Sequence, residues 1–270
     1  YLSLMQKRSK LIKSRGFVVR QNQVNSPFGE RLLLLDLDSN LEQAEGENLV
    51  ALRKSLNALG PTKLNKLGVL TGRSVKAARK RFAELHLPDP TVWICRAGTE
   101  IYYGKEDQAD RLWQSSIGVD WNRAGVELAL SALKDHVELQ EEEQQSPYKV
   151  SYLLRKPDAA ILPLLRKRLR QEGQAALPYL RCHWYLDVVP LRASRTEAIR
   201  HLVLRWGLPL EQIFVVASEQ GDAELLRGLT TAVVPAEHDS SLEPLRSQQR
   251  VFFASRSKNG LLEGLKHYRF

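Results

Sequence analysis

The sequence has no long run of apolar residues, which excludes a protein that crosses a membrane on helices. Hydrophobic residues make up 43% of the 270 positions, enough for a substantial core. No run approaches the roughly 20 residues that a spanning helix needs, and no secretory signal is visible. We therefore expect a cytoplasmic protein with no membrane partner, built as two modest domains or as one domain with an insertion.

Cysteine is almost absent as well. The two cysteines, Cys95 and Cys182, lie far apart and match no metal-binding spacing. Two reduced, buried thiols are typical of a cytosolic protein.

Positive charge is abundant, but aromatic residues do not alternate with it. The net charge is +9 and aromatic residues make up only 7% of the chain. Basic residues are spread along the predicted helices, as in RKRLRQ at 166–171, whereas a nucleic-acid stacking platform interleaves them with aromatics. We therefore expect a solvated basic surface and no nucleic-acid partner. Nucleic-acid binding stays open as an alternative that rests on net charge alone.

The most informative stretch that is present is LLLLDLD, residues 32–38. Four leucines run into Asp36 and Asp38. So short an apolar run is typical of a buried strand in a parallel sheet. Residues two apart in a strand face the same way, so the two carboxylates converge where open α/β sheets bind ligands. Like charges at that distance require a positive partner.

The order of the predicted elements indicates an α/β protein with a doubly wound parallel sheet. Strands and helices alternate up to about residue 105, and the third strand turns at Gly98 into a hairpin. A long helix over 120–145, a strand at 148–154 and a basic helix at 159–171 then break the pattern. Alternation resumes with strands at 213–218 and 231–235. The predicted division is a core over 27–105 and 186–270, a small α+β cap over 106–185, and a basic linker over 1–26.

The D-x-D at the end of the first strand resembles the first motif of the haloacid dehalogenase superfamily of phosphohydrolases. That resemblance implies that Asp36 attacks phosphorus to form an aspartyl phosphate and that Asp38 is the acid/base. It also implies a bridging Mg²⁺, which offsets the repulsion between the carboxylates. An ordinary acidic pair on the surface is the alternative.

Later segments resemble the sucrose-phosphate phosphatase branch of that superfamily. LTGRS implies that Thr71 binds the phosphoryl group, with Gly72 and Arg73 beside it. YKVSY implies that Lys149 balances the charge of the intermediate, although an ordinary lysine at a strand edge is the alternative. AGTEIYYG implies that Gly98, Thr99 and Glu100 lie near sugar hydroxyls, and here the alternative is a buried turn.

The sequence departs from the phosphatase pattern at three places, and two of these, Arg195-Thr196 and the last motif, resemble the carboxyl-terminal phosphatase-like domain of sucrose-phosphate synthase. Asn40 stands where the phosphatases carry Thr, and Arg195-Thr196 stands where they carry Lys-Gly. The last motif reads SEQGDAE, so Glu219 and Asp222 are the expected metal ligands, together with Asp36 and Asp38.

This resemblance implies a domain that binds sucrose-6-phosphate with weak or no hydrolysis, holds Mg²⁺ weakly and follows an upstream glycosyltransferase domain. The alternative is an active Mg²⁺-dependent sucrose-6-phosphate phosphatase. In either case the site is expected in one cleft between core and cap. Its predicted members are Asp36, Asp38, Thr71, Lys149, Glu219 and Asp222.

Overall fold

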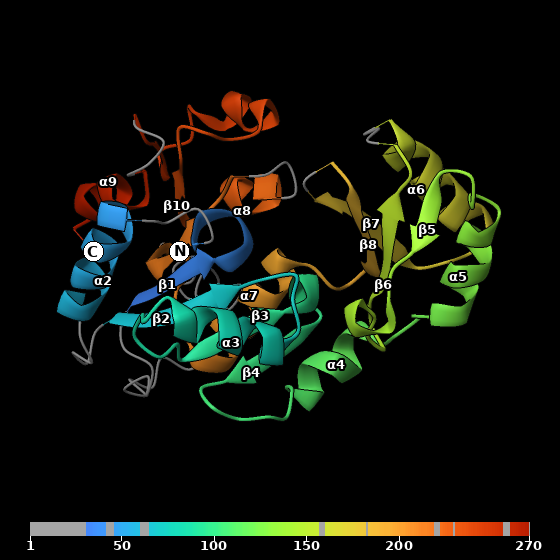
Figure 1. Ribbon diagram of the computed structural model, residues 1–270, viewed down its shortest axis with the longest axis horizontal. Helices are drawn as coiled ribbons and strands as arrows, with labels where there is room; N and C mark the ends of the chain where they lie inside the picture. Colours follow the sequence, from blue (N-terminus) through green and yellow to red (C-terminus); the bar gives the residue numbers. More distant parts are fainter. Residues whose placement is uncertain are drawn as a thin grey trace, which may run out of the picture.

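The computed structural model describes residues 31–41, 46–59, 65–156, 160–181, 183–218, 222–228, 230–255 and 260–269. These residues form two lobes, each built on its own sheet (Figure 1). The predicted linker over 1–26 and Cys182 lie outside the described residues, whereas Cys95 is a buried free thiol. No helix in the described part of the chain is long and apolar enough to cross a membrane.

The larger lobe contains a seven-stranded sheet in the order β11-β10-β9-β1-β2-β3-β4. Its strands are β1 (Arg31–Asp36), β2 (Asn65–Leu70), β3 (Val92–Cys95), β4 (Glu100–Tyr103), β9 (Ile213–Val216), β10 (Thr231–Val234) and β11 (Val251–Phe253). All neighbours are parallel except the hairpin of β3 and β4. The doubly wound sheet, including the pairing of β1 with β2, is as predicted. The edge strand β11 had not been predicted.

The four leucines of β1 are buried on both faces of this sheet, each at most 2% exposed. Leu33 and Leu35 belong to a cluster with apolar residues of α2 (Gly46–Leu59), α3 (Val75–Glu84) and α9 (Gly260–His267). Leu32 and Leu34 belong to a cluster with residues of α7 (Arg195–Trp206) and α8 (Ala223–Arg227). Each buried leucine contributes roughly 1.5–3 kcal/mol. Helices on both faces explain why this strand does not alternate with polar residues.

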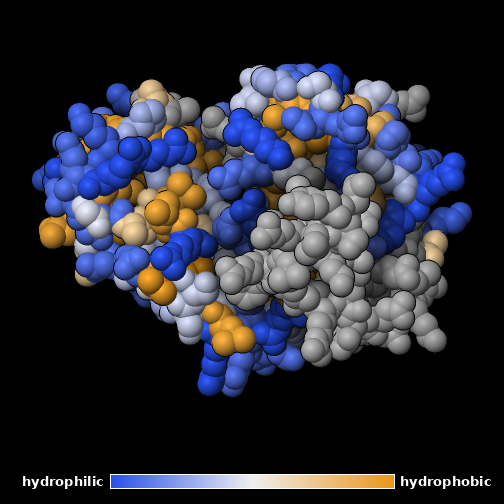
Figure 2. Space-filling model, turned by 180° about the vertical axis from the view of Figure 1, so that it is seen from behind, coloured by the Kyte–Doolittle hydropathy of each residue, from blue (hydrophilic) through white to orange (hydrophobic). Residues whose placement is uncertain are grey.

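The smaller lobe contains an antiparallel sheet in the order β5-β6-β8-β7. Its elements are α5 (Arg123–Ser131), β5 (Val137–Leu139), β6 (Val150–Leu154), α6 (Ile161–Gln171), β7 (Ala176–Arg181) and β8 (Tyr185–Pro190). Apolar residues of α5 and α6 pack on one face, against Val150 and Tyr152 of β6. Figure 2 shows the outer surface of this lobe, at the left, as mostly hydrophilic with scattered apolar residues.

Two predicted boundaries differ from the structure. The long helix over 120–145 is wrong: α5 ends at Ser131, and β5 follows because Val137 pairs with Leu154 and is buried in the smaller lobe. Tertiary pairing overrides helical periodicity at this point. The predicted return to the core at residue 186 falls inside β8, which pairs with β6 and β7 in the smaller sheet. The division into core and cap stays a proposal, with the return placed after Pro190.

The connection between the lobes begins at α4 (Arg111–Ile117), which packs on the larger lobe through Trp113 and Ile117. Asp110 caps this helix by accepting from the backbone N–H groups of Leu112 and Trp113. The same carboxylate accepts hydrogen bonds from Tyr103 and Arg205 of the larger lobe. The start of the connection is therefore fixed to the core.

Candidate functional site

Polar side chains gather at the carboxyl ends of β1, β2 and β9. Asp36 is the last residue of β1, Thr71 follows β2, and Asp222 precedes α8 after β9. All three are at most 2% exposed. Strand order reverses between β1 and β9, because β2 and β9 flank β1 on opposite sides. Such a switch point is where open α/β sheets bind ligands.

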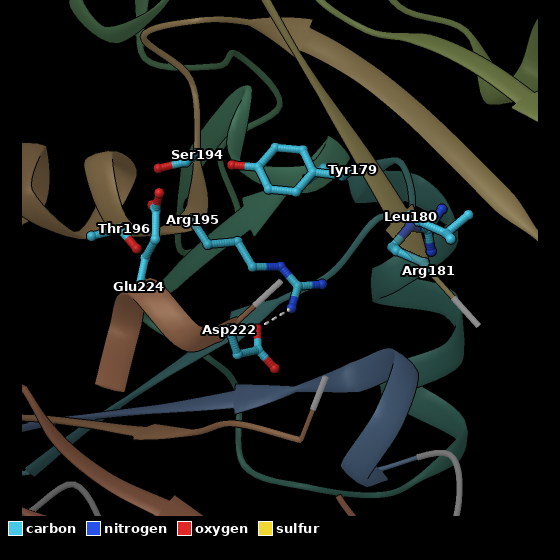
Figure 3. A pocket seen from close by; sticks show the side chains of 9 residues that line it. Tyr179, Leu180, Arg181, Ser194, Arg195, Thr196, Asp222 and Glu224 are labelled. Atoms are coloured by element: carbon cyan, nitrogen blue, oxygen red, sulfur yellow. Dashed lines mark hydrogen bonds and ion pairs between the residues drawn. The ribbon is translucent and has the colours of Figure 1, made fainter. Parts of the chain in front are cut away.

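Arg195 joins the two buried carboxylates at this point. Its Nη1 lies 2.6 Å from Oδ2 of Asp36 and 3.1 Å from Oδ1 of Asp222. The other oxygens also accept hydrogen bonds, from the N–H of Asp38 at 2.8 Å and of Ser218 at 3.0 Å. Arg195 is the first residue of α7, which Ser194 caps. Figure 3 shows its guanidinium directed at Asp222. The two acids therefore share one positive charge, which lowers the cost of burying them together.

Asp38 faces a different set of donors. The residues that follow β1 form a short π-helical turn, Leu37–Leu41, in which Asp38 turns towards β2. Its carboxylate accepts from the Thr71 hydroxyl at 2.9 Å, the Gly72 N–H at 2.6 Å and Nε of Arg73 at 2.9 Å. Burial alone raises the pKa of Asp38, but the Gly72 N–H and the nearby arginines outweigh burial and lower the pKa below its usual value.

Lys149 lies in a second polar cluster, in the smaller lobe. It is fully buried, and its Nζ lies 3.2 Å from Oδ1 of Asp187 on β8. Asp187 also accepts from the Ser151 hydroxyl at 2.7 Å and from Nε of Arg181 at 2.8 Å. Burial, together with the nearby Arg181 and Arg96, lowers the pKa of Lys149, and Asp187 opposes this shift only in part. For Asp187, burial raises the pKa, but Arg181 and Lys149 outweigh burial and lower it.

This position of Lys149 corrects the geometry expected from the sequence. The charge beside Asp36 comes from Arg195, on α7, whereas the Lys149 ammonium pairs with Asp187. Lys149 is also not the ordinary strand-edge lysine of the alternative, since its side chain is fully buried. A role in balancing the charge of an intermediate stays a prediction for Lys149.

Gly98, Thr99 and Glu100 form a buried turn that supports α7. A Cβ on Gly98 would lie 2.6 Å from the carbonyl carbon of Ser194, so glycine lets the turn pack against the start of the helix. The Thr99 hydroxyl donates to the carbonyl of Arg96, and Glu100 accepts from the Tyr102 hydroxyl. This geometry agrees with the buried-turn alternative. Contact of these residues with a sugar stays a prediction.

The same turn holds its backbone in the left-handed region at three successive residues. The φ angles are +52° at Arg96, +60° at Ala97 and +98° at Gly98. Two of these residues carry a Cβ, for which that conformation costs energy. Nη1 of Arg96 donates to the carbonyl of Glu143 in the smaller lobe. Strain of this kind concentrates at functional sites, and here it lies between the two lobes.

A pocket lies next to Arg195 and opens between the lobes. Ala97, Ser194, Arg195, Thr196, Asp222 and Glu224 line it from the larger lobe, and Tyr179, Leu180 and Arg181 line it from β7 of the smaller lobe (Figure 3). Both lobes therefore contribute to this pocket, and Asp222 is the one predicted cleft residue among those that line it, so the convergence of the six residues in one cleft stays a prediction.

The site as described does not fit Mg²⁺, the ion that the resemblance implies. Mg²⁺ requires oxygen ligands at about 2.1 Å in near-octahedral geometry. The place between Asp36 and Asp222 is held by a guanidinium nitrogen, and Asp38 turns towards Thr71. Glu219 lies outside the described residues. Among those described, no group of three or more His, Cys, Asp or Glu side chains is placed to hold a metal ion.

Three residues of the site were missed by the sequence interpretation. Arg195 was noted only as a departure from the phosphatase pattern, and Asp187 and Arg181 were not singled out. A lone carboxylate within the buried run YLDVVP is a detectable signal, because a buried charge requires a partner. No pattern in the sequence identifies which cation that partner is.

Comparison with known proteins places these features in a family. Residues 29–269 match the family model described as sucrose-6F-phosphate phosphohydrolase. A probable sucrose-phosphate synthase 1 from Craterostigma plantagineum is 29% identical over 178 residues, which cover 56% of this chain and 16% of that protein. Sucrose-phosphatase 1 from Nicotiana tabacum is 30% identical over 177 residues, which cover 64% of this chain and 41% of that protein. The chain thus matches less than half the length of these relatives.

Solved structures show the same fold. The sucrose-phosphatase from Synechocystis sp. PCC6803, in complex with sucrose and phosphate, superposes with a TM-score of 0.79 at 21% identity. The alignment covers 90% of this chain and 99% of that one. A sugar phosphatase of haloacid dehalogenase subclass IIB superposes with a TM-score of 0.62 at 14% identity, covering 88% and 99%. The predicted haloacid dehalogenase-type α/β fold is confirmed.

Proposed function

The chain belongs to the sucrose-6F-phosphate phosphohydrolase family, and from that premise we propose that it is a sucrose-phosphatase-like domain that binds a phosphorylated sugar and hydrolyses it weakly or not at all. Sucrose-6-phosphate is the ligand we expect. The Synechocystis relative was crystallised with sucrose and phosphate, which supports a ligand of this class.

One observation carries the binding half of the proposal. The Thr71 hydroxyl, the Gly72 N–H and the Arg73 guanidinium converge on one carboxylate. A hydroxyl, a backbone amide and a guanidinium are the donors that bind phosphate oxygens in proteins. We propose that the sugar lies in the pocket between the two lobes, which Arg181 lines next to Gly72.

The positions of the two predicted catalytic carboxylates support weak hydrolysis. To attack phosphorus, Asp36 needs an oxygen that faces the substrate, but both of its oxygens already accept hydrogen bonds. To protonate a leaving group, Asp38 must leave Thr71 and Gly72. Misplacement of catalytic groups by about 1 Å can cost on the order of a hundredfold in rate. We propose that Mg²⁺ binds weakly for a related reason, because it must displace Arg195.

An active Mg²⁺-dependent phosphatase that forms an aspartyl phosphate is the second candidate. The closeness of two buried acids favours it, since Asp36 and Asp222 both lie within 3.1 Å of one nitrogen. If Arg195 withdrew, these acids would present adjacent oxygens to a cation. Hydrolysis at an ordinary enzyme rate would select this candidate.

A role beside a synthase is a further part of the proposal. The sucrose-phosphate synthases that this chain resembles are far longer than the matched region, which is 16% of the Craterostigma protein. We propose that the domain accompanies an upstream glycosyltransferase domain and senses its phosphorylated product or stabilises it.

Calorimetric titration with sucrose-6-phosphate tests the binding proposal. We expect a Kd of about 1 mM or lower, and about tenfold weaker binding by Thr71→Val, which keeps the shape and removes the hydroxyl. Thr230→Val is the matched control, because Thr230 is also buried and its hydroxyl donates to a backbone carbonyl, that of Leu225. Absence of binding at millimolar ligand would leave a purely structural domain.

A further inference from the structure

The Asp38 carboxylate occupies the place in which an anion would bind. Thr71 approaches both of its oxygens, at 2.9 and 3.1 Å, and Gly72 and Arg73 each donate to one of them. The protein's own Asp38 is thus the acceptor for all three of these donors. A carboxylate presents two oxygens, as one edge of a phosphate group does. A ligand phosphate can therefore reach these donors only after Asp38 has moved.

A further cation reaches the same place from the smaller lobe. Arg181 ends β7, and its Nη1 lies 4.0 Å from Oδ2 of Asp38. A Cβ built on Gly72 would lie 2.8 Å from both Cζ and Nη1 of Arg181. The guanidinium therefore lies directly against the backbone of Gly72, where a side chain would exclude it. This contact is independent of the ion pair with Asp38.

A buried carboxylate fixes the direction of Arg181. Its Nε donates to Oδ2 of Asp187 at 2.8 Å, and Asp187 is fully buried. Lys149 and Ser151 hold the other oxygen of Asp187. Because Nε of Arg181 donates to Asp187, Nη1 of the same guanidinium is directed towards Asp38 in the larger lobe. Arg181 is also one of the residues that line the pocket (Figure 3).

We propose that Arg181 is the cap's contribution to phosphate recognition, and that the Asp38 carboxylate stands in for the phosphate until a ligand displaces it. This proposal rests on the proposed function, because it concerns the same anion position. A phosphate monoester carries about −1.5 to −2 charge at pH 7 and three acceptor oxygens. It can therefore engage Arg73 and Arg181 more fully than one carboxylate does. Arg181 is thus a specificity residue for the phosphoryl group.

Titration with inorganic phosphate tests this proposal apart from any sugar. We expect Asp38→Asn to bind phosphate about tenfold more tightly than the unmodified chain, because the competing charge is gone. We expect Arg181→Gln to bind it about tenfold more weakly. Arg192→Gln is the matched control, since Arg192 is 58% exposed and lies 3.8 Å from an exposed aspartate. That control should bind phosphate as the unmodified chain does.

The double variant makes the test sharper. Arg181→Gln should weaken phosphate binding more in the Asp38→Asn background, where Arg181 no longer loses a contact when phosphate enters. Lys149 and Ser151 still bond to Oδ1 of Asp187 when Arg181 is replaced, but Oδ2 loses the Arg181 donor, so thermal unfolding verifies that each variant folds.

Equal affinities of Arg181→Gln and Arg192→Gln would overturn the proposal, and so would an Asp38→Asn variant that binds no more tightly. No phosphate binding by any variant at millimolar concentration would also overturn it. Sucrose-6-phosphate that binds with the same affinity to all these variants would leave the proposed function standing and remove only this inference. Phosphate that binds in the expected order, without any binding of the sugar phosphate, would remove only the choice of sugar.

Discussion

Nη1 of Arg195 lies 2.6 Å from Oδ2 of Asp36, although the two residues are 159 positions apart in the sequence. The same nitrogen reaches Asp222, so one guanidinium ties the start of α7 to the end of β1 and to the start of α8. The protein itself therefore supplies a positive charge at the point where the resemblance implies a metal ion. Both the weak hydrolysis and the weak Mg²⁺ binding that we propose depend on this ion pair.

Removal of Arg195 should increase affinity for Mg²⁺. Without the guanidinium, Asp36 and Asp222 repel each other, and an added cation relieves that repulsion. We expect Arg195→Ala to bind Mg²⁺ about tenfold more tightly than the unmodified chain in a calorimetric titration with MgCl₂. Arg200→Ala is the control, because Arg200 lies on the same helix, is 54% exposed and pairs with Glu197. Equal Mg²⁺ affinity of the two variants would contradict this account.

Asp187 should be essential for stability. Asp187→Asn leaves the Lys149 ammonium and the Arg181 guanidinium without their shared negative partner, and Lys149 is fully buried. Breaking a buried ion pair costs about 3 kcal/mol or more. We expect a loss of that size in the free energy of unfolding by urea. Glu138→Gln breaks a pair in which both partners are more than half exposed, and it should cost under about 0.5 kcal/mol. Similar losses in the two variants would show that the cluster is not held as described.

Gly98 should tolerate no side chain. Gly98→Ala places a Cβ within 2.8 Å of the backbone of Ser194 and Arg195, which cannot move without shifting α7, and the φ of +98° adds strain. We expect a loss of roughly 3 kcal/mol in unfolding free energy. Gly104→Ala also has a positive φ, of +52°, but no atom within 4 Å of the new Cβ, so it should lose only about 1 kcal/mol. The comparison separates steric conflict from backbone strain, and equal losses would refute the packing argument.

Acid should weaken the connection between the lobes through Asp110. Its buried carboxylate accepts from the Tyr103 hydroxyl at 2.5 Å and also lies 3.0 Å from Nε2 of His201 and 3.1 Å from Nη1 of Arg205. Burial raises the pKa of Asp110, but hydrogen bonds from Tyr103 and His201 outweigh burial and lower it.

A carboxyl whose pKa is lower in the folded state stabilises the fold above its unfolded pKa, about 3.9 for Asp, and this contribution disappears as the pH falls through the lower folded value. Asp110→Asn should therefore be less stable than the unmodified chain at pH 6, and the difference should shrink below pH 4. Thermal unfolding between pH 3 and pH 6 measures the difference. A difference in stability between Asp110→Asn and the unmodified chain that stays constant from pH 3 to pH 6 would show that the charge of Asp110 contributes nothing to stability.

The parts of the fold that sequence predicted well are those fixed by local pattern. The run of four leucines had to be covered on both faces, and this requirement alone indicated a central strand with helices on either side. The end of that strand then placed Asp36 beside Thr71. The helix predicted over 120–145 failed because its end is set by pairing of Val137 with Leu154, a contact that periodicity does not contain.

The site was predicted less completely, since its partners are cations from distant segments. Arginine and lysine occur 40 times in the chain, and nothing in their local sequence tells which one meets a buried acid. Lys149 was expected beside Asp36, whereas Arg195 lies there and Lys149 pairs with Asp187. Arg195 reaches Asp36 because α7 packs against the 96–98 turn, and Gly98 permits this packing.

Release of phosphate from sucrose-6-phosphate in the presence of Mg²⁺, measured beside an Asp36→Asn control, tests the central claim most directly. We predict that the unmodified chain binds the sugar phosphate but releases phosphate far more slowly than an ordinary enzyme, whose turnover is on the order of 10 s⁻¹. Turnover near that rate, abolished by Asp36→Asn, would contradict the account and establish an active phosphatase.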